Sequence, residues 1–171
     1  MKMLALLSAV NVAVFLCLAA APGFCAEHDD ADLEKGIAAF NRGDLVGAMA
    51  AYETAAHAGS AEAQVRLAYI LDHAEENSEA VRWYRAAAEQ GHADGLAGLA
   101  EMYSKGEGVE LNEAEALRLF EQAAIAGHKG AMRVLAAAYE RGHLGVAPDA
   151  AKSAFWKSRQ AIMDDAENAG E

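Results

Sequence analysis

The side chains in this sequence that could do acid, base or metal chemistry are six His residues and 26 carboxylates. Two of the His residues, His92 and His128, each follow a Gly at places 36 residues apart. A metal-binding or catalytic His needs partners that converge on it, and here the surrounding residues repeat instead. We therefore expect His92 and His128 to mark the starts of two equivalent helices.

A second group, His73 with Glu75 and Glu76, has the residue types of a divalent-cation site. It falls in a short segment between two helical patterns, where a solvated acidic loop is the more common outcome. The sequence contains no nucleophile elbow, phosphate loop, His-Glu-x-x-His or dinucleotide fingerprint. We predict no catalytic residue, no cofactor and no bound metal.

The helices that position these side chains belong to sequence repeats. Residues 80–91 align with residues 116–127 at a shift of 36, and residues 48–59 align with residues 80–91 at a shift of 32. A second pattern alternates with the first and places small or apolar residues at i, i+4 and i+8, on one helical face. Its copies are Ala63, Leu67, Leu71; Gly95, Leu99, Tyr103; and Ala131, Leu135, Tyr139. Such periods predict an all-α fold, an α/α solenoid of stacked antiparallel helix pairs with about seven to eight helices.

Glycine-containing turns separate the two helices of a repeat at residues 106–109 and 142–146. Asn112 and Asp149, three residues after the Val of each turn, suit the N-cap of the helix that follows. Each repeat is thus predicted to be helix A, a turn and helix B, where helix A carries the i, i+4, i+8 pattern. The large residues of helices B, Trp83 and Leu119 among them, are expected to be buried between neighbouring helices.

The residues from Gly95 to Gly127 read Gly-x₃-Leu-Ala-x₂-Tyr-x₂-Gly-x-Gly-Val-x₂-Asn-x₃-Ala-x₂-Leu-Phe-x₂-Ala-Ala-x₂-Gly. This pattern resembles the Sel1-like repeat, a relative of the tetratricopeptide repeat, and the likeness extends over residues 45–163. It is weaker over residues 63–91, where the Gly-x-Gly-Val turn is missing, and residues 32–58 look more like a tetratricopeptide half-unit.

The resemblance implies a non-catalytic adaptor or regulator for protein–protein interaction. The implied partner is another envelope or periplasmic protein, such as a sensor kinase or an assembly complex, because some periplasmic relatives dock on the outer domain of a membrane sensor kinase. Some secreted relatives are linked with β-lactams, but they carry paired Cys in each repeat and this chain does not. Binding or hydrolysis of cell-wall fragments or β-lactams is therefore the alternative function.

The first 26 residues have the pattern of a signal peptide: Lys2, then an apolar run to Ala21, then small residues. An uncleaved membrane anchor is the alternative, because the run is long enough to span a bilayer. Ser8, Asn11 and Pro22 weigh against the anchor. We predict cleavage between residues 23 and 26, a periplasmic or secreted protein, and no stable membrane insertion after cleavage.

The rest of the chain is strongly acidic. Residues 27–171 keep all 26 acidic side chains and 13 of the 14 basic ones, a net charge of −13, which argues against a nucleic-acid partner. We divide this part into a flexible start at residues 27–31, the repeat solenoid at residues 32–163 and an acidic, disordered tail at residues 164–171.

The candidate partner-binding residues lie away from the core face of helices A. In stacked helix pairs these helices line the inner curve of the solenoid, which such proteins use for extended partners. We predict that the partner binds this concave helix-A surface, while the convex helix-B face and the acidic tail stay open as alternatives. The predicted contact residues are Tyr69, Glu101, Arg133 and Glu140.

Overall fold

The structure is a computed structural model that describes the backbone of residues 22–169 and the side chains of residues 31–169. Most of the predicted signal peptide, residues 1–21, lies outside this range. The described residues form eight helices, which confirms the all-α solenoid. In chain order they are α1 Pro22–Asn41, α2 Leu45–Ala58, α3 Ala61–His73, α4 Asn77–Glu89, α5 Ala93–Lys105, α6 Glu113–Ile125, α7 Lys129–Arg141 and α8 Ala150–Asn168.

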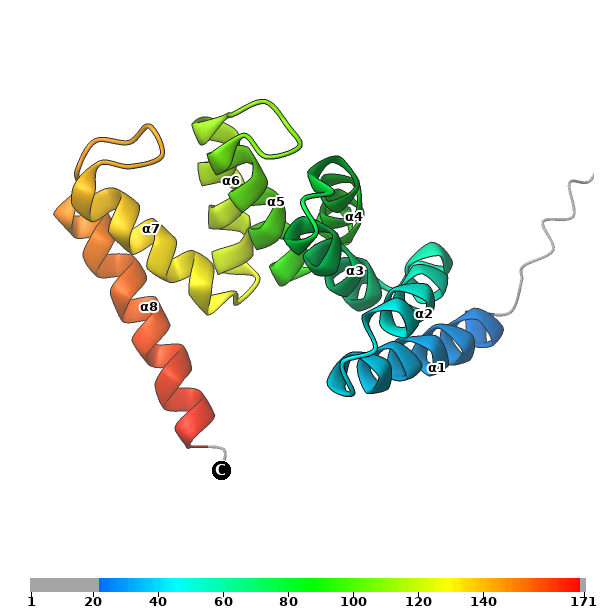
Figure 1. The fold of residues 1–171 in the computed structure, drawn as a ribbon. Coiled ribbons are helices and arrows are strands. Elements are labelled where there is room, and N and C mark those ends of the chain that lie inside the picture. Colours follow the sequence, from blue (N-terminus) through cyan, green and yellow to red (C-terminus); the bar gives the residue numbers. More distant parts are fainter. Residues whose placement is uncertain (1–21, 170–171) are drawn as a thin grey trace, which may run out of the picture.

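Each helix packs against the helices before and after it in the sequence. Helices A (α3, α5 and α7) alternate with helices B (α4, α6 and α8), and α3 also contacts α5 directly. The pairs follow one another along an arc, with α1 at one end and α8 at the other (Figure 1). Within the described part of the chain, no helix is both long and apolar enough to cross a membrane.

The predicted helix boundaries of the second and third repeats are confirmed. Asn112 and Asp149 are N-caps, and the side chain of each accepts a backbone N–H hydrogen bond at 3.0 Å. Gly106 and Gly142 end α5 and α7 with φ values of 73° and 78°, in the left-handed region that glycine adopts without strain. The local sequence therefore sets where these helices begin and end.

The first repeat lacks the long glycine turn, and its two helices are joined by three residues. Glu75 occupies the turn with a φ of 63°, a left-handed conformation that a glycine would adopt more easily. His73 and Glu76 beside it are exposed, like Glu75 itself. The three side chains that resemble a cation site thus lie on a tight, solvated turn.

Two clusters of buried side chains run through the solenoid. One fills the space around α1, α2 and α3 and contains Tyr52 and Leu67. The other spans α3 to α7 and contains Leu119 and Leu135. The burial predicted for Leu119 is therefore confirmed.

Trp83 is less buried than predicted, because it lies at the border between the two clusters rather than inside either of them. Its ring meets the exposed His57 ring edge to face, with the ring centroids 5.0 Å apart. Leu71 is the other partly buried residue that packs against both clusters in the described structure. The two clusters thus meet at α3, which contributes buried residues to both, and Trp83 and Leu71 pack against both of them.

Both ends of the described chain are more helical than predicted. The backbone of residues 27–31, expected to be flexible, belongs to α1, because no Gly or Pro interrupts the helix before it packs on α2. Residues 164–168, expected to be disordered, continue α8. Their acidic side chains have a partner: Lys129 Nζ lies 2.6 Å from Asp164 Oδ1 and 2.5 Å from Glu167 Oε2, which ties this end of α8 to the start of α7.

Candidate functional site

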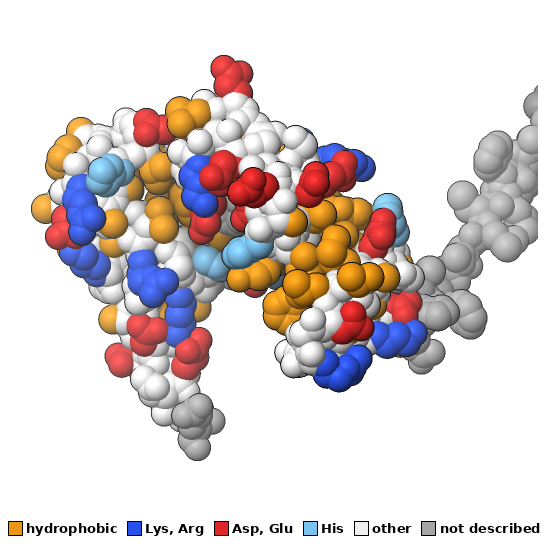
Figure 2. All heavy atoms as spheres, viewed as in Figure 1, with side chains coloured by type: hydrophobic (Ala, Val, Ile, Leu, Met, Phe, Trp, Pro, Cys, Tyr) orange, Lys and Arg blue, Asp and Glu red, His pale blue; other side chains and the backbone are white. Residues whose placement is uncertain are grey.

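The concave side of the solenoid holds a groove of about 550 Å³. Its walls come from α1, α3 and α5, with His128 at the end next to α7. The space-filling view shows hydrophobic side chains gathered over α1–α3, with His and acidic side chains beside the central hollow (Figure 2). The groove therefore combines an apolar part and an acidic part on one face.

The floor of the groove is the ring of Tyr84, which reaches it from α4. The ring lies against Gly98 of α5, where a Cβ atom would come within 2.4 Å of the ring. Burial raises the pKa of the Tyr84 hydroxyl well above its ordinary value, and the negative charges of Asp72 and Glu101 raise it further. Glycine at position 98 thus lets the Tyr84 ring pack directly against α5.

Two aromatic side chains stand in the groove with large exposed surfaces. Phe40 at the end of α1 is 37% exposed, and Tyr69 on α3 is 48% exposed. The Tyr69 ring lies against the His73 ring, with the ring centroids 4.1 Å apart. Exposed aromatic surface in a hollow is typical of the centre of a protein interface.

The two repeated His residues join successive helices A. His92 and His128 are the N-cap residues of α5 and α7, as predicted, and His128 Nδ1 accepts a hydrogen bond from the Ala131 N–H at 2.9 Å. His92 Nε2 lies 3.2 Å from Glu62 Oε2, and His128 Nε2 lies 3.3 Å from Asp94 Oδ1. Each His therefore contacts a carboxylate from the first turn of the preceding helix A.

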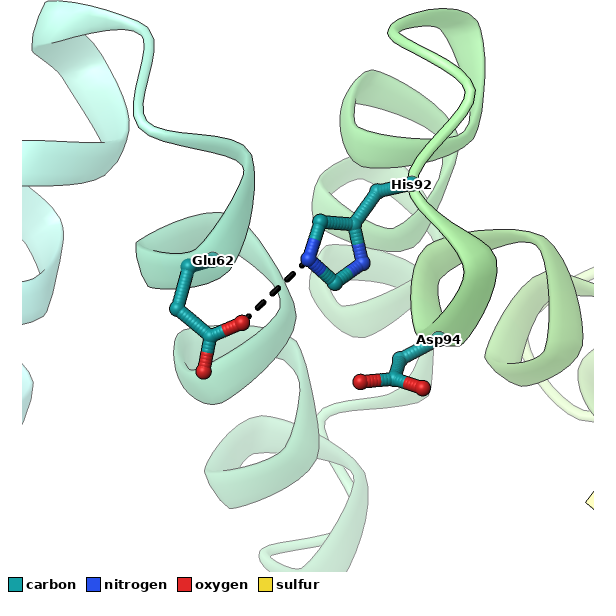
Figure 3. A group of neighbouring side chains, drawn as sticks. All are labelled: Glu62, His92 and Asp94. Atoms are coloured by element: carbon teal, nitrogen blue, oxygen red, sulfur yellow. Dashed lines mark ion pairs between the residues drawn. The ribbon is translucent and has the colours of Figure 1, made fainter. Parts of the chain in front are cut away.

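Glu62, His92 and Asp94 converge closely enough to be considered as a metal site, since one ligand atom from each lies within 4.8 Å of the others (Figure 3). Their atoms are already engaged in ion pairs. Arg66 Nη2 lies 2.6 Å from Glu62 Oε1, and a metal ion here would meet that fixed positive charge. We interpret the group as an ion-pair network between repeats.

The four predicted contact residues do not form one site. Tyr69 and Glu101 line the groove. Glu140 lies in a separate hollow against α8, where Lys157 Nζ approaches it to 3.0 Å and holds the pKa of its carboxyl below the usual range. Arg133 is exposed on α7 and lines neither hollow. Arg133 and Glu140 therefore lie outside the groove that Tyr69 and Glu101 line, and Glu140 contacts α8 through Lys157. Their part in partner contact stays a prediction.

The model of the Sel1 repeat family matches residues 61–92, 93–128 and 130–156, which is more than half of the chain. The chain belongs to the Sel1 repeat family. Proteins of this family are generally scaffolds for protein–protein interaction. The first two Sel1 repeats correspond to α3–α4 and α5–α6, and the third begins with α7 and ends within α8. The groove is thus built by the first two Sel1 repeats together with α1.

Two solved structures are similar to this Sel1 repeat chain over most of its length. A Sel1 repeat protein from Oxalobacter formigenes is 26% identical with a TM-score of 0.71, over 79% of this chain and 57% of that one. A protective antigen of uropathogenic Escherichia coli strains that displays an SLR fold is 28% identical with a TM-score of 0.72, over 81% of this chain and 31% of that one. This chain therefore matches only part of each longer protein. No curated protein matches it.

The four predicted contact residues leave out several residues of the groove. Asp72 follows Tyr69 by three residues, and this spacing places both side chains on the same side of α3, away from its core face. Asp94 comes from the first turn of the next Sel1 repeat, and Phe40 comes from α1, which precedes the matched repeats. These two residues reach the groove because of how the helix pairs stack, and no local sequence pattern predicts that stacking.

Proposed function

We propose that this Sel1 repeat protein is a non-catalytic adaptor or regulator that binds one protein partner in the groove of α1, α3 and α5. The observation that carries the proposal is the pair of exposed aromatic side chains, Phe40 and Tyr69, inside a concave hollow with a polar surround. Aromatic residues are enriched at the centres of protein interfaces and often contribute most of the binding energy. The general scaffold role of Sel1 repeats supports the same interpretation.

We also propose that the protein works in the periplasm or outside the cell, with another envelope protein as its partner. The signal-peptide pattern of residues 1–26 supports this location. Release of a mature chain that begins between residues 24 and 27 by osmotic shock is the expected result. A membrane-bound chain that retains Lys2 would contradict it.

The test of the groove compares two exposed aromatic residues in different places. Tyr69→Ala removes the groove side chain, and Phe155→Ala is the matched control, because Phe155 on α8 is 53% exposed and lies outside the groove. Each tagged mature variant is used to capture proteins from an envelope extract. We expect Tyr69→Ala to lose the protein that the wild-type chain captures and Phe155→Ala to keep it, with melting of Tyr69→Ala within about 0.5 kcal/mol of wild type.

Two other results would redirect the proposal. Capture that survives Tyr69→Ala but disappears when residues 164–171 are deleted would assign binding to the end of α8. Turnover of a chromogenic β-lactam by the purified mature chain would assign the protein to the alternative, enzymatic class. The adaptor proposal predicts neither result.

A further inference from the structure

We propose that the groove selects a basic segment of its partner and holds an Arg or Lys side chain between the Tyr69 ring and the carboxylates that line the groove. The inference rests on the proposed role of the groove as a docking surface, and it adds the chemistry of the occupant. The three carboxylates concerned are those of Asp72, Asp94 and Glu101.

The charges that line the groove are unbalanced. The three carboxylates face one guanidinium, that of Arg66, and Arg66 already forms its ion pair with Glu62 at 2.6 Å. Lys105 reaches Glu101 only at the 4.0 Å limit of an ion pair. His73 and His128 also border the groove, and His128 Nε2 lies 3.3 Å from Asp94 Oδ1. The carboxylates that line the groove thus outnumber its Arg and Lys side chains, which makes the groove acidic.

The same three carboxylates also influence the Tyr84 hydroxyl, which lines the groove. Asp72 from α3 and both Asp94 and Glu101 from α5 all act on the Tyr84 hydroxyl and raise its pKa, in addition to the effect of burial. The three carboxylates thus come from two helices that line the same groove. Glu101 and Asp94 are 55% and 56% exposed, so both are accessible to a cation that enters the groove.

The aromatic surfaces match the same kind of side chain. Tyr69 and Phe40 offer exposed aromatic surface in the same groove as the carboxylates. A guanidinium can stack on an aromatic ring while it donates hydrogen bonds to a carboxylate, and a Lys ammonium can approach the ring face as a cation. The volume of about 550 Å³ leaves space for the apolar neighbours of such a residue beside the rings.

The test selects ligands without assuming a sequence. A phage-displayed library of random dodecapeptides is selected on the immobilised mature chain, and the binding of each selected peptide to Tyr69→Ala is then measured. We expect Arg and Lys to be enriched at least threefold over the unselected library. Synthetic peptides from the selection should bind at least tenfold more weakly in 0.5 M than in 0.05 M NaCl, because salt screens exposed charges. Replacing their Arg by citrulline should weaken binding by a similar factor.

Glu101→Gln and Glu140→Gln form the matched pair of protein variants. The two glutamates are 55% and 53% exposed, and Glu101 lies in the groove while Glu140 lies outside it. We expect Glu101→Gln to lower the affinity for the selected peptides at least fivefold and Glu140→Gln to leave this affinity unchanged. Asp72→Asn should act like Glu101→Gln.

The possible failures are distinguishable. Selection of neutral or acidic peptides that require Tyr69 would overturn the preference for a basic segment and leave the docking role of the groove standing. Selected peptides that bind Tyr69→Ala and the wild-type chain equally would show that the groove is not the docking surface, and both proposals would then fall.

Discussion

Trp83 offers the sharpest test of how this short solenoid is held together. Its side chain packs against the cluster around α1–α3 and against the cluster from α3 to α7, and Leu71 is its counterpart in this position. Repeat proteins are stabilised by contacts between neighbouring repeats. Weakening the contact between the two clusters can therefore make the helices on either side of it unfold at different denaturant concentrations. We therefore expect Trp83→Ala to lower both the stability and the cooperativity of the chain.

The magnitude follows from the partial burial of Trp83. Truncating a fully buried Trp to Ala costs about 3–5 kcal/mol, so a half-buried Trp should cost about 2 kcal/mol. Unfolding entropy of about 2.1 cal/mol/K per residue, over roughly 140 folded residues, converts this cost into a fall in melting temperature of about 7 °C. Trp83→Phe keeps an aromatic ring at the border and should lose less than half as much.

Tryptophan fluorescence is a suitable assay because the chain has two Trp residues, Trp83 and Trp156. In Trp83→Ala, Trp156 is the remaining one, and it packs against the cluster from α3 to α7. Urea unfolding followed by Trp156 fluorescence therefore reports that cluster, while far-ultraviolet circular dichroism reports all helices. We expect the dichroism to change at lower urea than the fluorescence. Coincident curves with an unchanged midpoint would refute the reasoning.

Three further predictions concern single contacts. Glu75→Gly should raise the free energy of unfolding by about 0.5–1 kcal/mol in urea titrations, because glycine adopts the observed positive φ without strain. Gly98→Ala should lower it by about 1–2 kcal/mol, because the new Cβ atom meets the Tyr84 ring, and an unchanged midpoint would contradict this close approach. The Lys129 ammonium holds the pKa of the Asp164 carboxyl below its usual range, so this contact should persist above about pH 4 and be lost as the pH falls further. The hydrogen-exchange rate of backbone amides 160–168, corrected for intrinsic rates, should therefore increase as the pH falls below about 4 in the wild-type chain. The same rate in Lys129→Met should not change in this way.

The features that depend on nearby residues could be predicted from the sequence. The spacing of small and apolar residues indicated the helix pairs, and the caps Asn112 and Asp149 act on backbone groups within three residues of themselves. The N-cap positions of His92 and His128 follow from the same repeat register. These contacts join residues that are close together in the sequence, so a local sequence pattern can predict them.

The groove could be predicted only in part. Tyr69 and Glu101 occupy equivalent positions in the first two repeats and do share the hollow. Arg133 and Glu140 take the positions of Val65 and Asp72 in the third repeat, and unlike them they do not line it. Their positions depend on the rotation from one helix pair to the next and on the contact of Lys157 with Glu140. The periodicity of a single repeat predicts neither this rotation nor this contact.

Photo-cross-linking in living cells tests the central claim, partner binding in the groove, most directly. A photoreactive phenylalanine analogue replaces Tyr69 in one strain and Phe155 in another, and products are identified by mass spectrometry after irradiation. Both positions are exposed aromatic sites, and only residue 69 lies in the groove. We predict that position 69 cross-links to one envelope protein, through a segment that contains Arg or Lys, and that position 155 does not. Cross-linking of the same protein from position 155 and not from position 69 would contradict the account.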